Sequence, residues 1–145
     1  MTAANKVVVL GAMERLDARD VDGVVATAAP GCTWHGFGPG PIGEDGYVEA
    51  IGTFLSAFGD SRFPVDAAVA EGDTVAVYHR LVGTHTGEFR GTAATGAAVT
   101  VPAIAVFRLA GGQIVEVTLH ADLLGLLMQI GAISAPGSAP APAEG

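Results

Sequence analysis

The spacing of apolar residues changes at Pro64, and this change constrains the fold more than any other feature of the sequence. Before Pro64, apolar residues recur every three or four positions, a pattern that predicts amphipathic helices. After Pro64 they alternate with other residues, a pattern that predicts β-strands joined by tight turns. Helices followed by a run of antiparallel strands indicate an α+β fold. We therefore expect a curved, mostly antiparallel sheet with helices on its concave face.

The same patterns locate the individual elements. Helices are expected at residues 9–16, 21–29, 44–58 and 123–130, the second and fourth capped by Asp20 and Asp122. Strands are expected at residues 65–70, 75–82, 100–109 and 114–120. Residues 31–43 hold five glycines and two prolines and are expected to form an irregular loop. One domain over residues 1–131 is followed by an Ala/Pro-rich segment, 132–145, which is expected to be disordered.

Charge and cysteine content exclude several classes of partner and site. Seven Lys and Arg against fifteen Asp and Glu give a net charge of −8, which argues against a nucleic-acid partner. The single cysteine, Cys32, excludes an internal disulfide or a cysteine zinc cluster and favours a cytoplasmic location. The apolar run Val7–Leu10 is too short for a membrane span or a secretion signal. We expect a soluble protein without a metal site.

Strand alternation predicts which side chains face the interior. Odd-numbered residues of the strands are mostly apolar, so His79 would be the lone ionisable group on the concave wall. A buried histidine can act as acid, base or hydrogen-bond donor, or it can simply fill space. His35, in the glycine-rich loop, could orient a substrate or fix the loop. Asp122 could supply a carboxylate at the pocket edge or only cap its helix. His79, His35 and Asp122 are the candidate catalytic residues.

Aromatic and small side chains could form an apolar binding cavity on the concave side of the sheet, and a volume of roughly 300 Å³ or more would support a ligand site. The candidate substrate-contacting residues are Trp34, Phe37, Phe54, Phe58, Tyr78, Ala103, Ala105, Phe107 and Leu119. Helical spacing also allows Phe54 and Phe58 to be ordinary core residues. The two alanines would leave volume on the wall, unless a helix packs closer to them.

Short blocks along the chain point to a family. They are Trp34–His35, Glu71–Asp73, Gly83–Phe89, Ala94–Gly96, Phe107–Arg108, Gly112–Glu116, Asp122–Leu126 and Gln129–Gly131. In order and spacing these blocks resemble the SnoaL-like polyketide (ester) cyclase family over roughly residues 8–131. The resemblance implies a cone-shaped NTF2-like fold, catalysis without a cofactor, and homodimers formed through the sheet.

The departures from that family bear on mechanism. The aldol cyclases of the family carry a catalytic aspartate on the last strand, and the corresponding position here is Leu119. Polar pocket positions on the preceding strand correspond to Ala103 and Ala105, and a tyrosine of the first helix corresponds to Leu16. None of these side chains can transfer a proton, so an aldol mechanism driven by that aspartate is not expected.

Three functions remain open. The first is a polyketide cyclase of natural-product (antibiotic) biosynthesis that closes a carbon ring mainly by preorganising its substrate, in a [4+2] or conjugate-addition reaction. The second is an acid–base cyclase (aldol) or epoxide hydrolase that uses Asp122 and a histidine. The third is a non-catalytic binding or assembly module. The expected partners are a small polyketide-derived molecule and a second copy of the chain.

Overall fold

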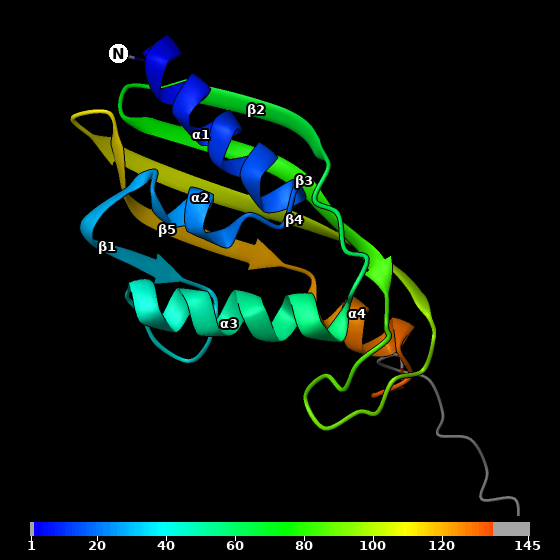
Figure 1. Cartoon of the computed structure of the whole chain (residues 1–145). Coiled ribbons are helices and arrows are strands. Elements are labelled where there is room, and N and C mark those ends of the chain that lie inside the picture. Colours follow the sequence, from blue (N-terminus) through cyan, green and yellow to red (C-terminus); the bar gives the residue numbers. More distant parts are fainter. Residues whose placement is uncertain (1, 135–145) are drawn as a thin grey trace, which may run out of the picture.

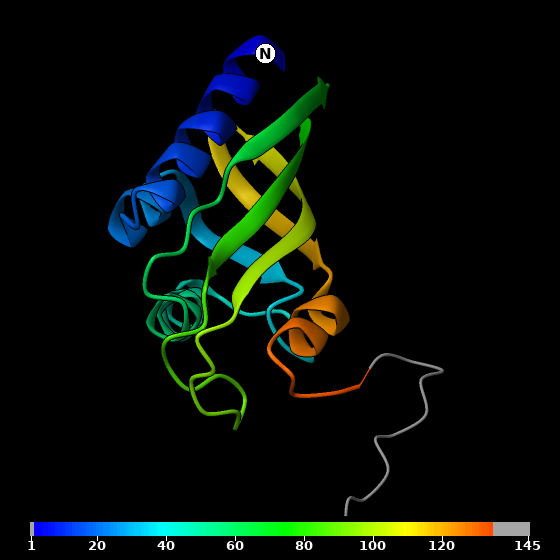
Figure 2. The ribbon, with the colours of Figure 1, turned by 90° about the vertical axis from the view of Figure 1, so that its right-hand side faces the viewer.

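A curved five-stranded sheet forms one layer of the molecule, and helices cover its concave face (Figures 1 and 2). The computed structural model describes residues 2–134. The strand order is β1-β5-β4-β3-β2, with β1 parallel to β5 and the other neighbours antiparallel. The strands are β1 (Ala28–His35), β2 (Val65–Glu71), β3 (Thr74–Thr84), β4 (Ala98–Ala110) and β5 (Gln113–Ala121). The predicted α+β architecture is confirmed.

Four helices pack around the sheet, and the last of them lies at the ends of the strands rather than over the concave face (Figure 2). The four helices are α1 (Thr2–Asp17), α2 (Val21–Val25), α3 (Glu44–Ala57) and α4 (Leu123–Gln129). Helix α1 packs on β2 and β3, α3 on β1, and α4 on β4, so the ends of the sheet are covered by different helices (Figure 2). Within residues 2–134, no helix has the length and apolarity that crossing a bilayer requires.

Both predicted aspartate caps are present. The Asp20 carboxylate accepts a hydrogen bond from the Gly23 N–H at 2.9 Å, and Asp122 accepts one from the Gly125 N–H at 2.8 Å. Each bond satisfies a backbone donor that the first turn of a helix leaves unpaired. These local bonds fix where α2 and α4 begin.

The region around Pro30 differs from the prediction. Helix α2 ends at Val25, and the segment expected to be a loop contributes an edge strand, β1. Pro30 falls between Ala28 and Thr33, where the register of β1 against β5 shifts. Proline is tolerated at such an irregularity of an edge strand because no ladder hydrogen bond is lost. Pro30, which was expected to end a helix, therefore lies at the irregular point of an edge strand.

The predicted alternation is confirmed in β3 and β4. Odd-numbered residues of β3 and β4 are buried along both strands. In β2 the even-numbered Ala68 and Ala70 pack against the core, and Val65 and Val69 are exposed.

The pairing of β5 with β4 changes register between Arg108 and Leu109 of β4. As a result, Ile114 of β5 rather than Val115 is buried in the core. The predicted disordered segment, 132–145, lies outside the described residues except for 132–134.

Candidate functional site

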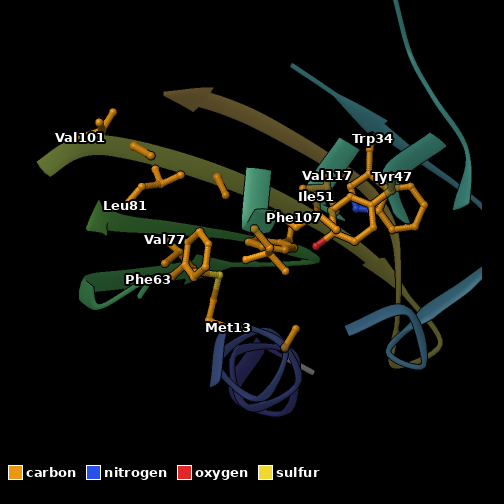
Figure 3. Packing of buried hydrophobic residues seen from close by; sticks show 14 of the residues in the cluster. Met13, Trp34, Tyr47, Ile51, Phe63, Val77, Leu81, Val101, Phe107 and Val117 are labelled. Atoms are coloured by element: carbon orange, nitrogen blue, oxygen red, sulfur yellow. The ribbon is translucent and has the colours of Figure 1, made fainter. Parts of the chain in front are cut away.

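The concave face, α1 and α3 enclose an apolar cavity of about 70 Å³, here called the inner pocket. Its walls come from α1, α2, β1, α3 and three central strands. The lining includes Met13, Leu16, Trp34, Phe37, Tyr47, Ile51, Phe63, His79, Leu81, Ala105, Phe107, Val117 and Leu119. Figure 3 shows several of these side chains converging from the helices and the sheet. A wall of this composition excludes water and favours apolar atoms.

A second, half-open cavity of about 380 Å³ adjoins the first and is called the outer pocket. It lies between α3, α4 and the neighbouring ends of β3, β4 and β5. Four residues line both pockets: Phe37, Ile51, Leu81 and Leu119. The single cavity expected from the sequence is therefore divided, with His79 in the small compartment and most of the volume in the other.

The structure brings two histidines to the pockets: His79 lines the inner pocket and His120 the outer one. His79 lies on β3 opposite Ala103 of β4, and only 3% of its surface is exposed. Its Nδ1 atom has no hydrogen-bond partner among residues 2–134. Burial lowers the pKa of His79 below the ordinary value of 6.5, so the imidazole is neutral near pH 7. A neutral imidazole can donate one hydrogen bond and accept another.

Tyr47 is a second polar group in the inner pocket, and the sequence prediction did not include it among the site residues. Its ring stacks on Trp34 with centroids 4.7 Å apart and meets Phe37 edge-on at 5.4 Å. In Figure 3 its hydroxyl oxygen points into the cluster of buried side chains. Burial raises the pKa of Tyr47, which keeps the hydroxyl protonated as a hydrogen-bond donor. The signal in the sequence was its place at the start of the apolar stripe of α3.

The two pockets contain no carboxylate among the described residues that line them. Nor do residues 2–134 bring together three His, Cys, Asp or Glu side chains that could hold a metal ion. Cys32 is buried, and this burial raises the pKa of its thiol to about 11. The thiol is therefore protonated near neutral pH and is a poor nucleophile.

The other predicted substrate contacts divide between pocket and core. Trp34, Phe37, Ala105, Phe107 and Leu119 line the inner pocket, and Phe54 lines the outer one. Phe58 is fully buried and lines neither, because it is packed between Phe54 and His85 with centroids 4.8 and 5.4 Å away. Ala103 is likewise buried outside both pockets. Tyr78 points to the convex face and is 46% exposed. It lines neither pocket, which corrects its prediction as a substrate contact.

Two predicted catalytic residues lie outside the pockets. His35 ends β1, and its Nε2 lies 3.0 Å from Glu116 Oε2, while Arg108 donates to Glu116 Oε1 at 3.1 Å. Arg108, and to a smaller extent His35, lower the pKa of Glu116. Asp122 is exposed and engaged as the cap of α4. Of the two roles predicted for Asp122, the structure shows the cap of α4, and neither His35 nor Asp122 lines a pocket.

His85 is held in the core. Its Nδ1 lies 2.9 Å from the Thr95 hydroxyl, and its ring stacks on Phe58. It lines neither pocket. Its contacts instead join the end of β3 to the turn at residues 95–97.

A comparison with protein-family models decides which family this arrangement belongs to. The model of SnoaL-like polyketide cyclases matches residues 7–130, nearly all of the described chain. The chain belongs to the SnoaL-like polyketide cyclase family. In this SnoaL-like protein, Leu119 lies where the two pockets adjoin. No curated protein matches the sequence.

Solved structures of similar proteins share the fold along almost their whole length. AclR of Streptomyces galilaeus, a candidate hydroxylase, is 25% identical with a TM-score of 0.85, over 92% of this chain and 99% of its own. A candidate SnoaL-like polyketide cyclase of Jannaschia species CCS1 is 27% identical with a TM-score of 0.80, over 91% and 94%. IdmH of Streptomyces antibioticus, a candidate polyketide cyclase, is 25% identical with a TM-score of 0.78, over 88% and 98%. The predicted NTF2-like fold is confirmed.

Proposed function

We propose that this SnoaL-like protein closes a carbon ring in a polyketide-derived substrate of natural-product (antibiotic) biosynthesis. The reaction is a [4+2] or conjugate-addition closure, and it needs no cofactor. One observation carries the proposal: the adjoining pockets are largely apolar and hold no carboxylate among the described lining residues. The Thr27 hydroxyl donates to the Val24 carbonyl, which leaves His79 and Tyr47 as the donors available to a ligand in the inner pocket. Such a site suits a reaction that depends on conformation more than on strong acids or bases.

Preorganisation supplies the main part of the rate enhancement. A flexible chain loses conformational entropy when its reacting ends come together. In a shaped cavity this entropy is lost when the substrate binds, so the loss no longer adds to the barrier of the reaction. In a [4+2] closure two carbon–carbon single bonds form as two π-bonds are consumed, and no atom enters or leaves. Because no proton moves, the leucine at position 119 is no obstacle to this reaction.

His79 activates the substrate by polarising a carbonyl group. Its neutral imidazole donates a hydrogen bond to the carbonyl oxygen, which withdraws electron density from a conjugated double bond. In a conjugate addition, one carbon–carbon bond forms, and a proton moves from the nucleophilic carbon to the carbon beside the carbonyl. The same imidazole can accept and return that proton through its two nitrogens. The Tyr47 hydroxyl is a second donor on the same wall.

Mass balance tests the proposal against a dehydrating aldol closure, an epoxide hydrolase and a binding module. A strain that lacks the gene should accumulate an uncyclised precursor, and the purified protein should convert it into an isomer of the same mass. An aldol closure with dehydration would lose one water, and an epoxide hydrolase would add one. Absence of any conversion would support a binding or assembly module. Each of these three results contradicts the proposed reaction. An aldol closure without dehydration also gives an isomer, and the new hydroxyl group on its product identifies it.

Two pocket variants sharpen the test. We expect His79→Gln to slow cyclisation by about 10²-fold, the order expected on removal of one positioned donor. Ala105→Phe should change the product ratio or block turnover, because its side chain would enter the inner pocket. Tyr78→Phe, on the convex face of the same strand, is the matched control and should leave the rate unchanged. If His79→Gln and Ala105→Phe both behave like wild type, the inner pocket is not the site of reaction.

We also propose that the active form is a cytoplasmic homodimer that associates through the convex face. Tyr78 and Ile104 pair across β3 and β4, and both are 46% exposed, while Val69 lies exposed on β2. Burying such a patch stabilises association in proportion to its apolar area. Light scattering should give twice the mass of the chain for wild type and the monomer mass for Ile104→Glu. A monomeric wild type would contradict this assembly.

A further inference from the structure

The outer pocket contains a positive charge that the inner pocket lacks. Among the described residues that line the outer pocket, Arg90 carries a permanent charge and none is acidic. The chain as a whole carries a net charge of −8. A lone guanidinium at the rim of an apolar cavity is thus opposite in sign to the protein around it. This contrast points to an anionic group on the ligand.

A tight turn presents Arg90 to the pocket. Arg90 has a φ of 48°, a left-handed conformation that few residues other than glycine adopt. The turn is closed by reciprocal backbone hydrogen bonds of 2.9 Å between Phe89 and Thr92. The Glu88 carboxylate accepts a hydrogen bond from the Gly91 N–H. Glu88, the nearest acid in sequence, is therefore occupied within the turn.

The guanidinium of Arg90 packs against an aromatic cluster. The central carbon of the Arg90 guanidinium lies 5.6 Å from the ring centroid of Phe89. Phe89 is itself buried and meets Phe54 and Phe58 edge-on, with centroids 6.1 and 5.4 Å away. A cation over a fixed ring keeps its orientation while its N–H groups stay free. Among residues 2–134, no carboxylate lies within ion-pair distance of Arg90.

We propose that Arg90 binds a carboxylate at one end of the substrate, whose apolar chain runs through the outer pocket toward His79. This inference rests on the proposed function for the polyketide origin of that chain. A carboxylate is favoured because one guanidinium matches one negative charge through two parallel hydrogen bonds. A phosphate monoester would carry a second negative charge, and the lining offers no other permanent cation to match it.

The consequence is a fixed direction of binding. The charged end stays at the rim beside α4, and the apolar end enters the adjoining inner pocket. Arg90 is then a specificity-determining residue, because it sets which carbons of the chain reach His79. It takes no part in bond formation.

A fluorescent polyene acid tests this assignment without knowledge of the natural substrate. The probe is cis-parinaric acid, an apolar conjugated chain that ends in a carboxylate, and its methyl ester is the neutral counterpart. Wild type should bind the acid about tenfold more tightly than the ester, the order of one charge-assisted contact at a partly solvated site. Added salt should reduce this preference, because it screens exposed charges.

Three variants assign the preference to Arg90. Arg90→Gln should lose about tenfold in affinity for the acid and change the affinity for the ester less than about twofold. Arg90→Lys should restore part of the loss, since it restores the charge without the planar fork. Arg108→Gln changes the net charge equally but lies on the convex face, so it should bind both probes as wild type does.

Competition separates the two sources of anionic charge. Dodecanoate should displace the probe at lower concentration than dodecyl phosphate does, and the reverse order would overturn the assignment to a carboxylate. Equal binding of acid and ester by wild type, or an undiminished preference in Arg90→Gln, would overturn the role of Arg90. Either result leaves the apolar cavity, and with it the proposed function, intact. If neither probe binds wild type, both proposals fail.

Discussion

The inner and outer pockets adjoin, yet they differ in packing and polarity. The inner pocket is small, enclosed by stacked aromatic rings, and contains the buried imidazole of His79. The outer pocket is several times larger, half open, and carries Arg90 at its rim. The two regions therefore contribute to different properties of the protein. The inner wall is part of the core that stabilises the fold, whereas the outer wall supplies volume and charge for recognition of a ligand.

The largest expected difference is in stability after truncation of a side chain in each pocket. Phe63 lines the inner pocket and is 2% exposed, so Phe63→Ala should lower the free energy of unfolding by about 3–5 kcal/mol. Leu123 lines the outer pocket and is 36% exposed, so Leu123→Ala should lower it by less than about 1 kcal/mol. Urea denaturation followed by circular dichroism measures both. Equal losses would remove the distinction between a structural and a recognition wall.

A glycine beside the shared boundary gives the next largest effect. Gly36 has a φ of +93°, and a Cβ atom there would lie 2.0 Å from the Leu119 carbonyl oxygen. Gly36→Ala should therefore destabilise the fold by about 1–3 kcal/mol, through backbone strain and this clash. Gly38→Ala, in the same loop with nothing within 4 Å of an added Cβ, is the control. If the two variants unfold at the same urea concentration, the close contact between β1 and β5 is absent.

The buried imidazole makes the stability of the inner pocket depend on pH. Burial lowers the pKa of His79, so the unfolded chain takes up a proton at a higher pH than the folded chain does. The stability of wild type should therefore fall as pH decreases below 6.5, with a slope of up to roughly 1.4 kcal/mol per pH unit. His79→Gln should flatten this dependence. An unchanged slope in His79→Gln would show that another group is responsible.

The smallest expected effect concerns the Tyr47 hydroxyl. No residue within 2–134 forms a hydrogen bond with it, so Tyr47→Phe should change the free energy of unfolding by less than about 1 kcal/mol. Tyr78→Phe, on the convex face, is the control for loss of an exposed hydroxyl. A loss above about 2 kcal/mol in Tyr47→Phe would mean that the hydroxyl is committed to the fold rather than free for a ligand.

Local patterns in the sequence were sufficient for much of the framework. Alternation along 75–82 and 100–109 gave the face of each strand and placed His79 on the concave wall. Asp20 and Asp122, each three residues before a glycine, marked the starts of two helices. These features are predictable because each depends on neighbours within one turn or one strand.

Features that depend on contacts between distant segments could not be predicted in this way. Pro30 and the glycines that follow it suggested a loop, but pairing with β5 makes the segment a strand and moves His35 to the surface near Glu116. Phe58 and Ala103 had suitable residue types for a cavity wall, yet packing against neighbouring elements fills the space around them. Tyr47 enters the inner pocket because Trp34 of β1 offers a ring to stack on.

Periodicity and composition, which are local and additive, predicted the α+β class and the apolar character of the wall. The family was predicted from the resemblance of short motifs along the chain. Tertiary structure decided that the cavity is divided at Phe37, Ile51, Leu81 and Leu119, that Tyr47 joins His79, and that Arg90 stands at the outer rim. A cavity is the space that packing leaves unfilled. Its shape therefore depends on how side chains far apart in the chain meet, which no single segment of the sequence specifies.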